Sequence, residues 1–167
     1  GKGASSTMPV EADDSKYLAE AIRLAQEGAS SNRGGPFGAI IVKDGKIIGK
    51  GNNGVTSTND PTAHAEVTAI RHACKEIADF QLDGTTIYSS CEPCPMCLAA
   101  IYWARIERVV YACTRDDAAD IGFDDAHIYN ELPLSNEERS IRIETMMRDE
   151  GLEAFKAWRE KGDKVRY

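Results

Sequence analysis

The sequence lacks the features that would place the protein in a membrane or send it out of the cell. No stretch approaches the roughly 20 consecutive apolar residues that a membrane-spanning helix needs. The first residues also lack the charged and then apolar pattern of a secretory signal. We therefore expect a cytoplasmic protein. The small, polar segment 1–7 before Met8 is typical of a vector remnant, and we predict that residues 1–14 form a tag remnant and flexible N-terminus.

The chain is also short of basic residues, with 20 Lys and Arg against 27 Asp and Glu, a formal net charge of -7. Lys and Arg neutralise the phosphates of polynucleotides, so this balance disfavours tRNA or DNA as a partner, although a local basic patch is compatible with it. The hydrophobic content of 42% and charged content of 28% are ordinary for a globular protein. We predict one compact domain over residues 15–167.

The cysteines do not form an even set, as a disulfide framework would require. There are five, and three of them, Cys91, Cys94 and Cys97, lie within seven residues of each other. In a chain without a secretion signal, this spacing favours metal binding or catalysis over disulfides.

The hydrophobic pattern predicts alternating helices and strands. Capping residues at 13–15 precede a helix that ends at Gly28. A strand, a metal-type loop, a helix and a second strand follow one another from Thr85, which implies a crossover and a parallel pair. The predicted elements after the first helix are a hairpin of 37–42 and 47–49 around Asp44-Gly45, a helix starting at His64, strands 85–90 and 109–113, helices 98–103, 117–119 and 150–161, and a strand at 141–146.

The most informative pattern is His64-Ala65-Glu66, followed 28 residues after Glu66 by Cys94-Pro95-Met96-Cys97. Zinc binds imidazole nitrogen and thiolate sulfur, and three protein ligands leave a fourth tetrahedral position for water. Two cysteines three residues apart face the same direction on a helical turn. The spacing therefore predicts a catalytic zinc site made by His64, Cys94 and Cys97.

Glu66 supplies the proton chemistry that such a site needs. Zinc lowers the pKa of a bound water to about 7, which gives a nucleophile at neutral pH. Glu66 lies two residues beyond His64, so we expect it to take the proton from this water and deliver it to a substrate nitrogen. The same H-x-E and P-C-x-x-C pattern is described for zinc-dependent nucleobase deaminases.

A structural zinc site is the main alternative, with Cys91 as the fourth ligand. A structural site has no need for the carboxylate of Glu66, and Cys91 lies on the strand side of Pro93. A zinc-stabilised binding module without turnover stays open as a second class of function.

At these motifs the sequence resembles the cytidine-deaminase-like superfamily, and within it the small bacterial guanine deaminases. The resemblance runs from about residue 17 to residue 167. It is carried by the two zinc motifs together with the segments 34–38, 59–66, 90–97, 102–105 and 122–125. It implies an α/β/α fold with a central five-stranded mixed sheet, one Zn²⁺ per subunit, and conversion of guanine to xanthine and ammonia. Attack would come from a metal-bound hydroxide on the amino-bearing ring carbon, with Glu66 as the proton shuttle.

The resemblance also assigns substrate contacts, position by position. It implies that Asn53 hydrogen-bonds the ring, that Asp125 reads the purine, and that the backbone N–H of Ala65 orients the base. It implies further that Phe37 and Trp103 line the base pocket. In the family the C-terminal segment crosses to a partner subunit in a homodimer, which would bring Tyr167 over the partner's site. Each assignment has a structural alternative: Asn53 suits a turn, Phe37 and Trp103 suit a core, and Asp125 suits a helix N-cap.

The core chemistry does not distinguish guanine from adenine or cytosine, because all three carry an amino group on an electron-poor ring carbon. A carboxylate at Asp125 only accepts hydrogen bonds, so it suits the ring N–H of guanine and is left unpaired by bases that lack this donor. Deamination of guanosine or another purine nucleoside is the nearest alternative. A tRNA adenosine deaminase is the third alternative, and the excess of Asp and Glu over Lys and Arg argues against it.

Overall fold

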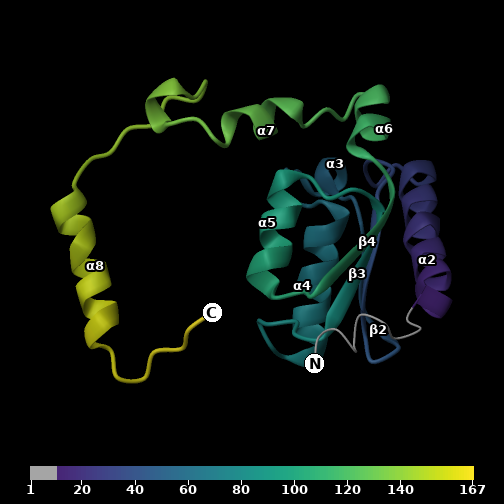
Figure 1. Cartoon of the computed structure of the whole chain (residues 1–167), viewed down its shortest axis with the longest axis horizontal. Helices are drawn as coiled ribbons and strands as arrows, with labels where there is room; N and C mark the ends of the chain where they lie inside the picture. The colour runs from purple at the N-terminus through teal and green to yellow at the C-terminus, as the bar shows by residue number, and fades with distance from the viewer. Residues whose placement is uncertain (1–10) are drawn as a thin grey trace. The chain divides into compact units, whose positions relative to one another are not determined.

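The structure is a computed structural model of the chain, and it describes residues 11–167 (Figure 1). The predicted vector remnant and most of the predicted N-terminal segment therefore lie outside the described residues. The chain divides into two compact units, Gly1–Asp125 and Ala126–Tyr167. The predicted domain 15–167 spans both units.

The first helix, α2 (Glu11–Ser30), begins before the caps that the sequence predicts. Residues 13–15 lie inside its first turns, so the predicted start is wrong. Asp14 does not cap the helix: its Oδ1 accepts hydrogen bonds from Tyr88 Oη at 2.6 Å and from Arg108 Nη1 at 2.9 Å. These bonds hold α2 against the sheet.

The predicted hairpin is confirmed as β1 (Gly38–Lys43) and β2 (Lys46–Asn52), which pair antiparallel. The turn residues Asp44 and Gly45 both have positive φ, 50° and 74°. A two-residue turn of this kind requires the left-handed region at both positions, which Asp and Gly tolerate better than other residues. The local sequence therefore determines this turn.

The other two strands form the predicted parallel pair. β3 (Thr85–Cys91) pairs antiparallel with β1 and parallel with β4 (Arg108–Cys113), and helix α5 (Pro95–Ala104) connects β3 to β4. The strand order is β2-β1-β3-β4. The sheet is mixed, as predicted, but it has four strands among the described residues and not five.

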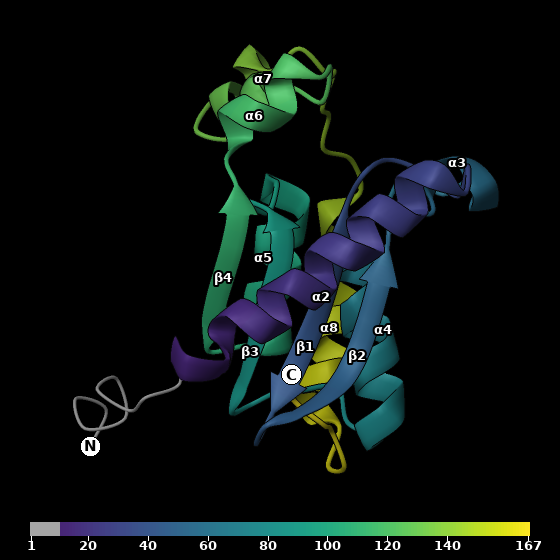
Figure 2. The same ribbon diagram turned by 90° about the vertical axis from the view of Figure 1, so that its right-hand side faces the viewer.

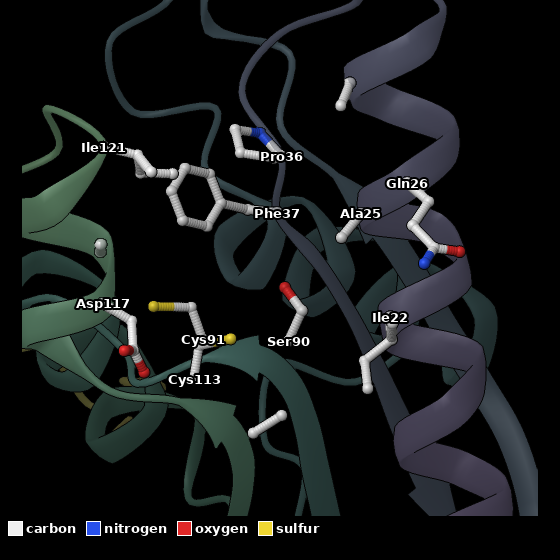
Figure 3. Close-up of a pocket in the computed structure, with 13 residues that line it drawn as sticks. Ile22, Ala25, Gln26, Pro36, Phe37, Ser90, Cys91, Cys113, Asp117 and Ile121 are labelled. Atoms are coloured by element: carbon white, nitrogen blue, oxygen red, sulfur yellow. The ribbon is translucent and has the colours of Figure 1, made fainter.

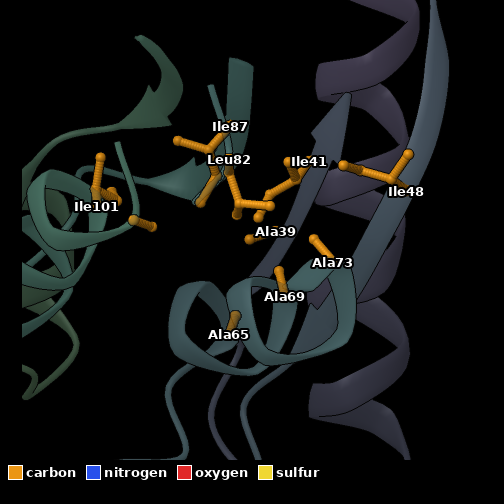
Figure 4. Close-up of a cluster of buried hydrophobic side chains, with 10 residues drawn as sticks. Ala39, Ile41, Ile48, Ala65, Ala69, Ala73, Leu82, Ile87 and Ile101 are labelled. Atoms are coloured by element: carbon orange, nitrogen blue, oxygen red, sulfur yellow. The ribbon is translucent and has the colours of Figure 1, made fainter. Parts of the chain in front are cut away.

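Helices cover both faces of this sheet, which confirms the α/β/α fold class (Figure 2). Helix α2 packs on one face, and its residues Tyr17, Ala21 and Leu24 share a core cluster with β1 and β3. Helices α4 (Ala65–Ile77) and α5 cover the other face. Their cluster is the larger one (Figure 4), and it consists of Ala39, Ile41, Ile48, Ala65, Ala69, Ala73, Leu82, Ile87, Ile101 and Ala104.

Helix α4 lies unusually close to β2. A Cβ atom placed on Gly51 would lie 2.5 Å from the carbonyl oxygen of Ala65 and 2.7 Å from the backbone nitrogen of Ala69. Such distances are shorter than van der Waals contact, so only glycine fits this position. The close approach fixes the start of α4, where the predicted His64 and Glu66 lie.

Two short helices complete the first unit, α3 (Val55–Thr58) and α6 (Arg115–Asp120). A side chain caps α6: the Thr114 hydroxyl accepts from the backbone nitrogen of Asp117 at 3.3 Å, and the Asp117 carboxylate accepts from the backbone nitrogen of Thr114 at 2.8 Å. This capping box begins the helix directly after β4.

The second unit contains α7 (Ala126–Glu131), a 3₁₀ turn (Asn136–Glu138) and α8 (Arg148–Glu160). The predicted last helix is confirmed as α8. The predicted strand at 141–146 is wrong, because this segment pairs with no strand in the described part of the chain, and an unpaired strand leaves its backbone groups without partners. Among residues 11–167, no helix is both long and apolar enough to cross a bilayer.

Candidate metal and active site

His64 and Cys94 lie at equivalent places in the fold, the N-cap positions of α4 and α5. Both have extended backbones, and neither side chain caps its own helix. Pro95 occupies the first turn of α5, where the missing N–H costs nothing. The imidazole and the thiol can therefore face another partner.

The imidazole of His64 and the thiol of Cys94 face each other and the thiol of Cys97. The structure thus brings the three predicted zinc ligands into one group, the metal group. His64 Nδ1 lies 3.5 Å from Cys94 Sγ and 3.4 Å from Cys97 Sγ. All three ligand atoms lie within 4.8 Å of one another. In tetrahedral zinc with ordinary bond lengths, an imidazole nitrogen and a thiolate sulfur are about 3.6 Å apart. The geometry of this group therefore fits a single zinc ion.

Cys91 is not part of the group. Its thiol donates to the carbonyl oxygen of Thr114 at 3.7 Å, and burial raises its pKa to about 11. By contrast, hydrogen bonds from Cys97 and His64 hold the pKa of Cys94 below its ordinary value. Cys94 is thus prepared to bind a metal as a thiolate, whereas Cys91 is a buried neutral thiol. The described residues offer three ligands rather than four, which is typical of catalytic zinc sites.

Glu66 lies in the first turn of α4, directly beside this group. It is the one charged residue that is buried among the described residues, with 7% of its surface exposed. Burial raises the pKa of its carboxyl, and the charge of Cys94 raises it further. A carboxyl with a raised pKa exchanges protons more readily near neutral pH. The neighbouring Ala65 is fully buried. Its backbone N–H has no acceptor within the helix, because Ala65 is in the first turn of α4.

Asn53 is buried, and its amide has a fixed orientation. Its Oδ1 accepts from the backbone N–H of Val55 at 3.0 Å and of Gly35 at 3.3 Å. A Cβ atom on Gly34 would lie 2.5 Å from this same oxygen. The oxygen is thus committed to the loop, and the amide nitrogen is the group left to donate. The turn interpretation and the ligand-binding interpretation of Asn53 are compatible.

Asp125 ends the first unit and lies within electrostatic reach of the metal group. Burial raises the pKa of its carboxyl; Arg115 opposes this effect, and the charge of Cys94 adds to it. The Arg115 Nε atom is 3.8 Å from Asp125 Oδ1. Helix α7 starts at the next residue, so the N-cap alternative for Asp125 stays open.

The predicted aromatic contacts differ in their surroundings. The ring of Phe37 packs on the larger core cluster and meets the ring of Phe123 edge-on, with centroids 5.0 Å apart. Trp103 is 61% exposed, so the core alternative is wrong for this residue. Tyr167 lies in the second unit and is 73% exposed. Their roles as substrate contacts stay predictions.

Phe37 also faces a cavity of about 360 Å³, which the sequence did not predict (Figure 3). Residues of α2, the ends of β3 and β4, and α6 line it, and Cys91 and Cys113 are among them. The ligand atoms of the metal group do not belong to this lining. The cavity is therefore distinct from the metal group.

Three ligands, a buried carboxylate beside them and a mixed sheet between helical layers define the class of hydrolytic zinc enzymes. Residues 11–113 match the family model of the cytidine and deoxycytidylate deaminase zinc-binding region. The chain belongs to this family of zinc-binding deaminases.

Several relatives are similar to the chain. The guanine deaminase of Bacillus subtilis is 55% identical over 151 residues, which covers 90% of the chain and 97% of the relative. A tRNA-specific adenosine deaminase of Aquifex aeolicus is 44% identical over 95 residues, 57% of the chain and 60% of the relative. The X-ray structure of the Bacillus subtilis guanine deaminase superposes with a TM-score of 0.89 at 54% identity, covering 92% of the chain and 98% of that structure. A guanine deaminase structure from Nitrosomonas europaea gives a TM-score of 0.62 at 29% identity, covering 83% and 70%.

Proposed function

We propose that this protein is a zinc-dependent hydrolytic deaminase that converts guanine to xanthine and ammonia. The observation that carries the chemistry is the buried carboxylate of Glu66 beside the group of His64, Cys94 and Cys97. The choice of guanine is supported by the Bacillus subtilis relative of that name, which is similar over nearly the whole of both chains.

One zinc ion per subunit is part of the proposal, held by His64, Cys94 and Cys97. When bound, zinc supplies an activated water as the nucleophile. Glu66 would take up one proton of this water and move it to the ring nitrogen, and would then carry the water's second proton to the amine, which leaves as ammonia. Its burial favours this role, because a desolvated carboxyl binds a proton more strongly than an exposed one.

The base is held by groups whose orientation the fold already fixes. Asn53 presents its amide nitrogen, because its oxygen is bound by two backbone N–H groups. The backbone N–H of Ala65 donates to the ring from the start of α4, and Phe37 and Trp103 contact its apolar faces. Fixed donors lose little conformational entropy when the substrate binds.

Asp125 provides the preference for guanine. An ionised carboxylate accepts hydrogen bonds and donates none, so it pairs with the N–H in the pyrimidine ring of guanine, a donor that the pyrimidine ring of adenine lacks. Comparing Asp125→Ala with the unchanged protein tests this role. We expect guanine kcat/KM to fall by about 10²-fold or more. Comparable turnover of guanine by the variant would refute the role.

A homodimer with exchanged C-terminal segments is the proposed assembly. No residue of 126–167 is buried, and Leu152, Phe155 and Trp158 form an exposed apolar face on α8. A segment with no buried side chain cannot offset its loss of chain entropy alone. We propose that it covers the site of a second subunit, with Tyr167 over the base. Sedimentation equilibrium tests this: a mass near 18.3 kDa, that of one chain, would refute it.

We propose the cytoplasm as the location, because the thiols of Cys94 and Cys97 must stay reduced to bind zinc. The periplasm or the outside of the cell would place these free thiols in an oxidising environment. Fractionation of the source cells, followed by detection of the protein in the soluble cytoplasmic fraction, tests this location.

The decisive experiment measures ammonia released by the zinc-loaded protein from guanine, guanosine, adenine, cytosine and ammeline, and inosine formed in a tRNA substrate. Guanine should be the best substrate. Preference for guanosine would make the protein a purine nucleoside deaminase. Activity on tRNA would make the protein a tRNA adenosine deaminase, as the Aquifex aeolicus relative is named. The net charge of -7 disfavours a tRNA substrate. No product from any substrate would indicate a non-catalytic zinc-binding module.

A further inference from the structure

We propose that Arg115 is a positioning residue that aligns the Asp125 carboxylate with residues 92–94, the metal loop between β3 and α5, and so determines how tightly guanine binds. The inference rests on the proposed function, since it concerns the recognition of the same substrate. Neither the zinc motifs nor the predicted substrate contacts include this arginine.

The main chain of Arg115 is tied to the metal loop. Its backbone N–H donates to Glu92 Oε1 at 3.1 Å, and the backbone N–H of Glu92 donates to the carbonyl oxygen of Cys113 at 2.8 Å. Glu92 lies two residues before Cys94. The start of α6 therefore cannot shift without moving the segment that carries the first thiolate.

The side chain of Arg115 reaches in the other direction, to the loop that carries Asp125. Its Nε lies 3.8 Å from Asp125 Oδ1, and the two side chains are 39% and 19% exposed. The same loop is folded back onto α6, because the backbone N–H of Phe123 donates to the carbonyl oxygen of Ala118 at 2.9 Å. Arg115 is thus the residue through which the metal loop and the Asp125 loop are joined.

The charge of Arg115 suits this position. Asp125 is partly desolvated and lies beside the charge of Asp124, and both effects disfavour an ionised carboxyl. The guanidinium of Arg115 opposes these effects, together with a backbone hydrogen bond at Asp125. A carboxyl that lost its charge could donate a hydrogen bond as well as accept one, and its preference for a ring N–H would weaken.

An arginine that acts through Asp125 should change binding more than chemistry. The proton shuttle Glu66 and the metal ligands lie in the first turns of α4 and α5 or at their N-caps, whereas Arg115 contacts the loop beside them. We therefore expect Arg115→Gln to raise KM for guanine by about tenfold while kcat stays within about threefold. Arg115→Lys keeps the charge and should recover most of this loss.

The experiment measures kcat and KM for guanine in the zinc-loaded full-length protein, with zinc content and melting temperature recorded for each variant. The matched control is Arg23→Gln, which removes a guanidinium from exposed ion pairs with Glu20 and Glu27 on α2 and should leave both constants unchanged. Because Arg115 is proposed to act through Asp125, the variant Asp125→Asn should suppress the effect of Arg115→Gln in the double variant.

Several results would overturn the inference: a KM for Arg115→Gln equal to that of the unchanged protein, a fall in kcat alone, or additive effects in the double variant. Binding of radiolabelled guanine by equilibrium dialysis separates this inference from the proposed function. A protein that binds guanine without turnover, and binds it about tenfold more weakly after Arg115→Gln, would refute the activity but support the role of Arg115. A protein that does not bind guanine would refute both.

Discussion

His64 and Cys94 occupy the same position in two different helices, the residue just before the first turn, and their Nδ1 and Sγ atoms lie 3.5 Å apart. Two helix N-termini therefore point at one place. Their partial positive charges favour thiolate at this point and favour a negatively charged nucleophile near it. The metal group is thus a product of how α4 and α5 pack, as well as of the sequence motifs.

Replacing Cys94 should remove the metal. We expect Cys94→Ser to retain little zinc after dialysis, because a neutral hydroxyl is a far weaker zinc ligand than a thiolate. Atomic absorption should show about one zinc per chain in the unchanged protein and close to none in the variant. Cys113→Ser is the matched control, since this exposed cysteine lies outside the metal group. Full zinc content in Cys94→Ser would contradict the assignment.

Glu66→Gln should separate metal binding from turnover. The glutamine has the same shape but cannot take up a proton, so kcat should fall by about 10²-fold to 10⁴-fold while zinc content stays unchanged. The exposed Glu76, on the same helix, provides the control Glu76→Gln, for which we expect normal turnover. Normal kcat in the Glu66 variant would show that another group moves the proton.

The sequence predicts those parts of the fold that local chemistry determines. Asp44 and Gly45 specify their turn by themselves, and the His64 and Cys94 motifs specify helix starts. The start of α2 could not be predicted in this way, because Asp14 is bound by Tyr88 and Arg108, which are 74 and 94 residues away along the chain. The apolar residues of 141–146 suggested a strand, but a strand also needs a neighbour.

In the candidate site, too, features that depend on local sequence could be predicted, and features that depend on contacts between distant elements could not. The ligands and Glu66 could be predicted because their residue types and spacings match the H-x-E and P-C-x-x-C pattern of zinc-dependent deaminases, in which the two cysteines face the same direction on one helical turn. Gly51 and Arg115 could not, since their importance depends on approaches between β2 and α4 and between α6 and the Asp125 loop. Composition gives no signal for such contacts between elements.

Gly51→Ala tests whether the close packing of α4 on β2 supports the metal group. The new methyl group would lie 2.5 Å from the carbonyl oxygen of Ala65, so α4 must move. We expect the free energy of unfolding to fall by about 1–3 kcal/mol, and zinc to dissociate faster in the presence of a chelator. Gly54→Ala is the control, because its nearest neighbour would be 3.7 Å away. Equal chelator rates for the two variants would show that the start of α4 is fixed by other contacts.

The Asp14 carboxylate should contribute to stability in a way that depends on pH. Its hydrogen bond with Arg108 holds its pKa below the ordinary value of 3.8. Because the pKa is lower in the folded state, the contribution is present in full above 3.8 and is lost as the pH falls through the folded-state value. Asp14→Asn should therefore lower the free energy of unfolding by about 1.5–3 kcal/mol at neutral pH, the usual contribution of hydrogen bonds to a charged group.

Urea unfolding of the unchanged protein and of Asp14→Asn, at neutral pH and at several values below 3.8, measures this difference. Loss of zinc in acid affects both proteins, so it cancels when the two are compared at the same pH. Asp13→Asn provides the control, because Asp13 is an exposed neighbour on the same helix and should show little effect. The difference in free energy of unfolding between the unchanged protein and Asp14→Asn should shrink as the solution becomes more acidic. A difference that stays constant with pH would mean that the shape of the side chain, and not its charge, stabilises the contact between α2 and the sheet.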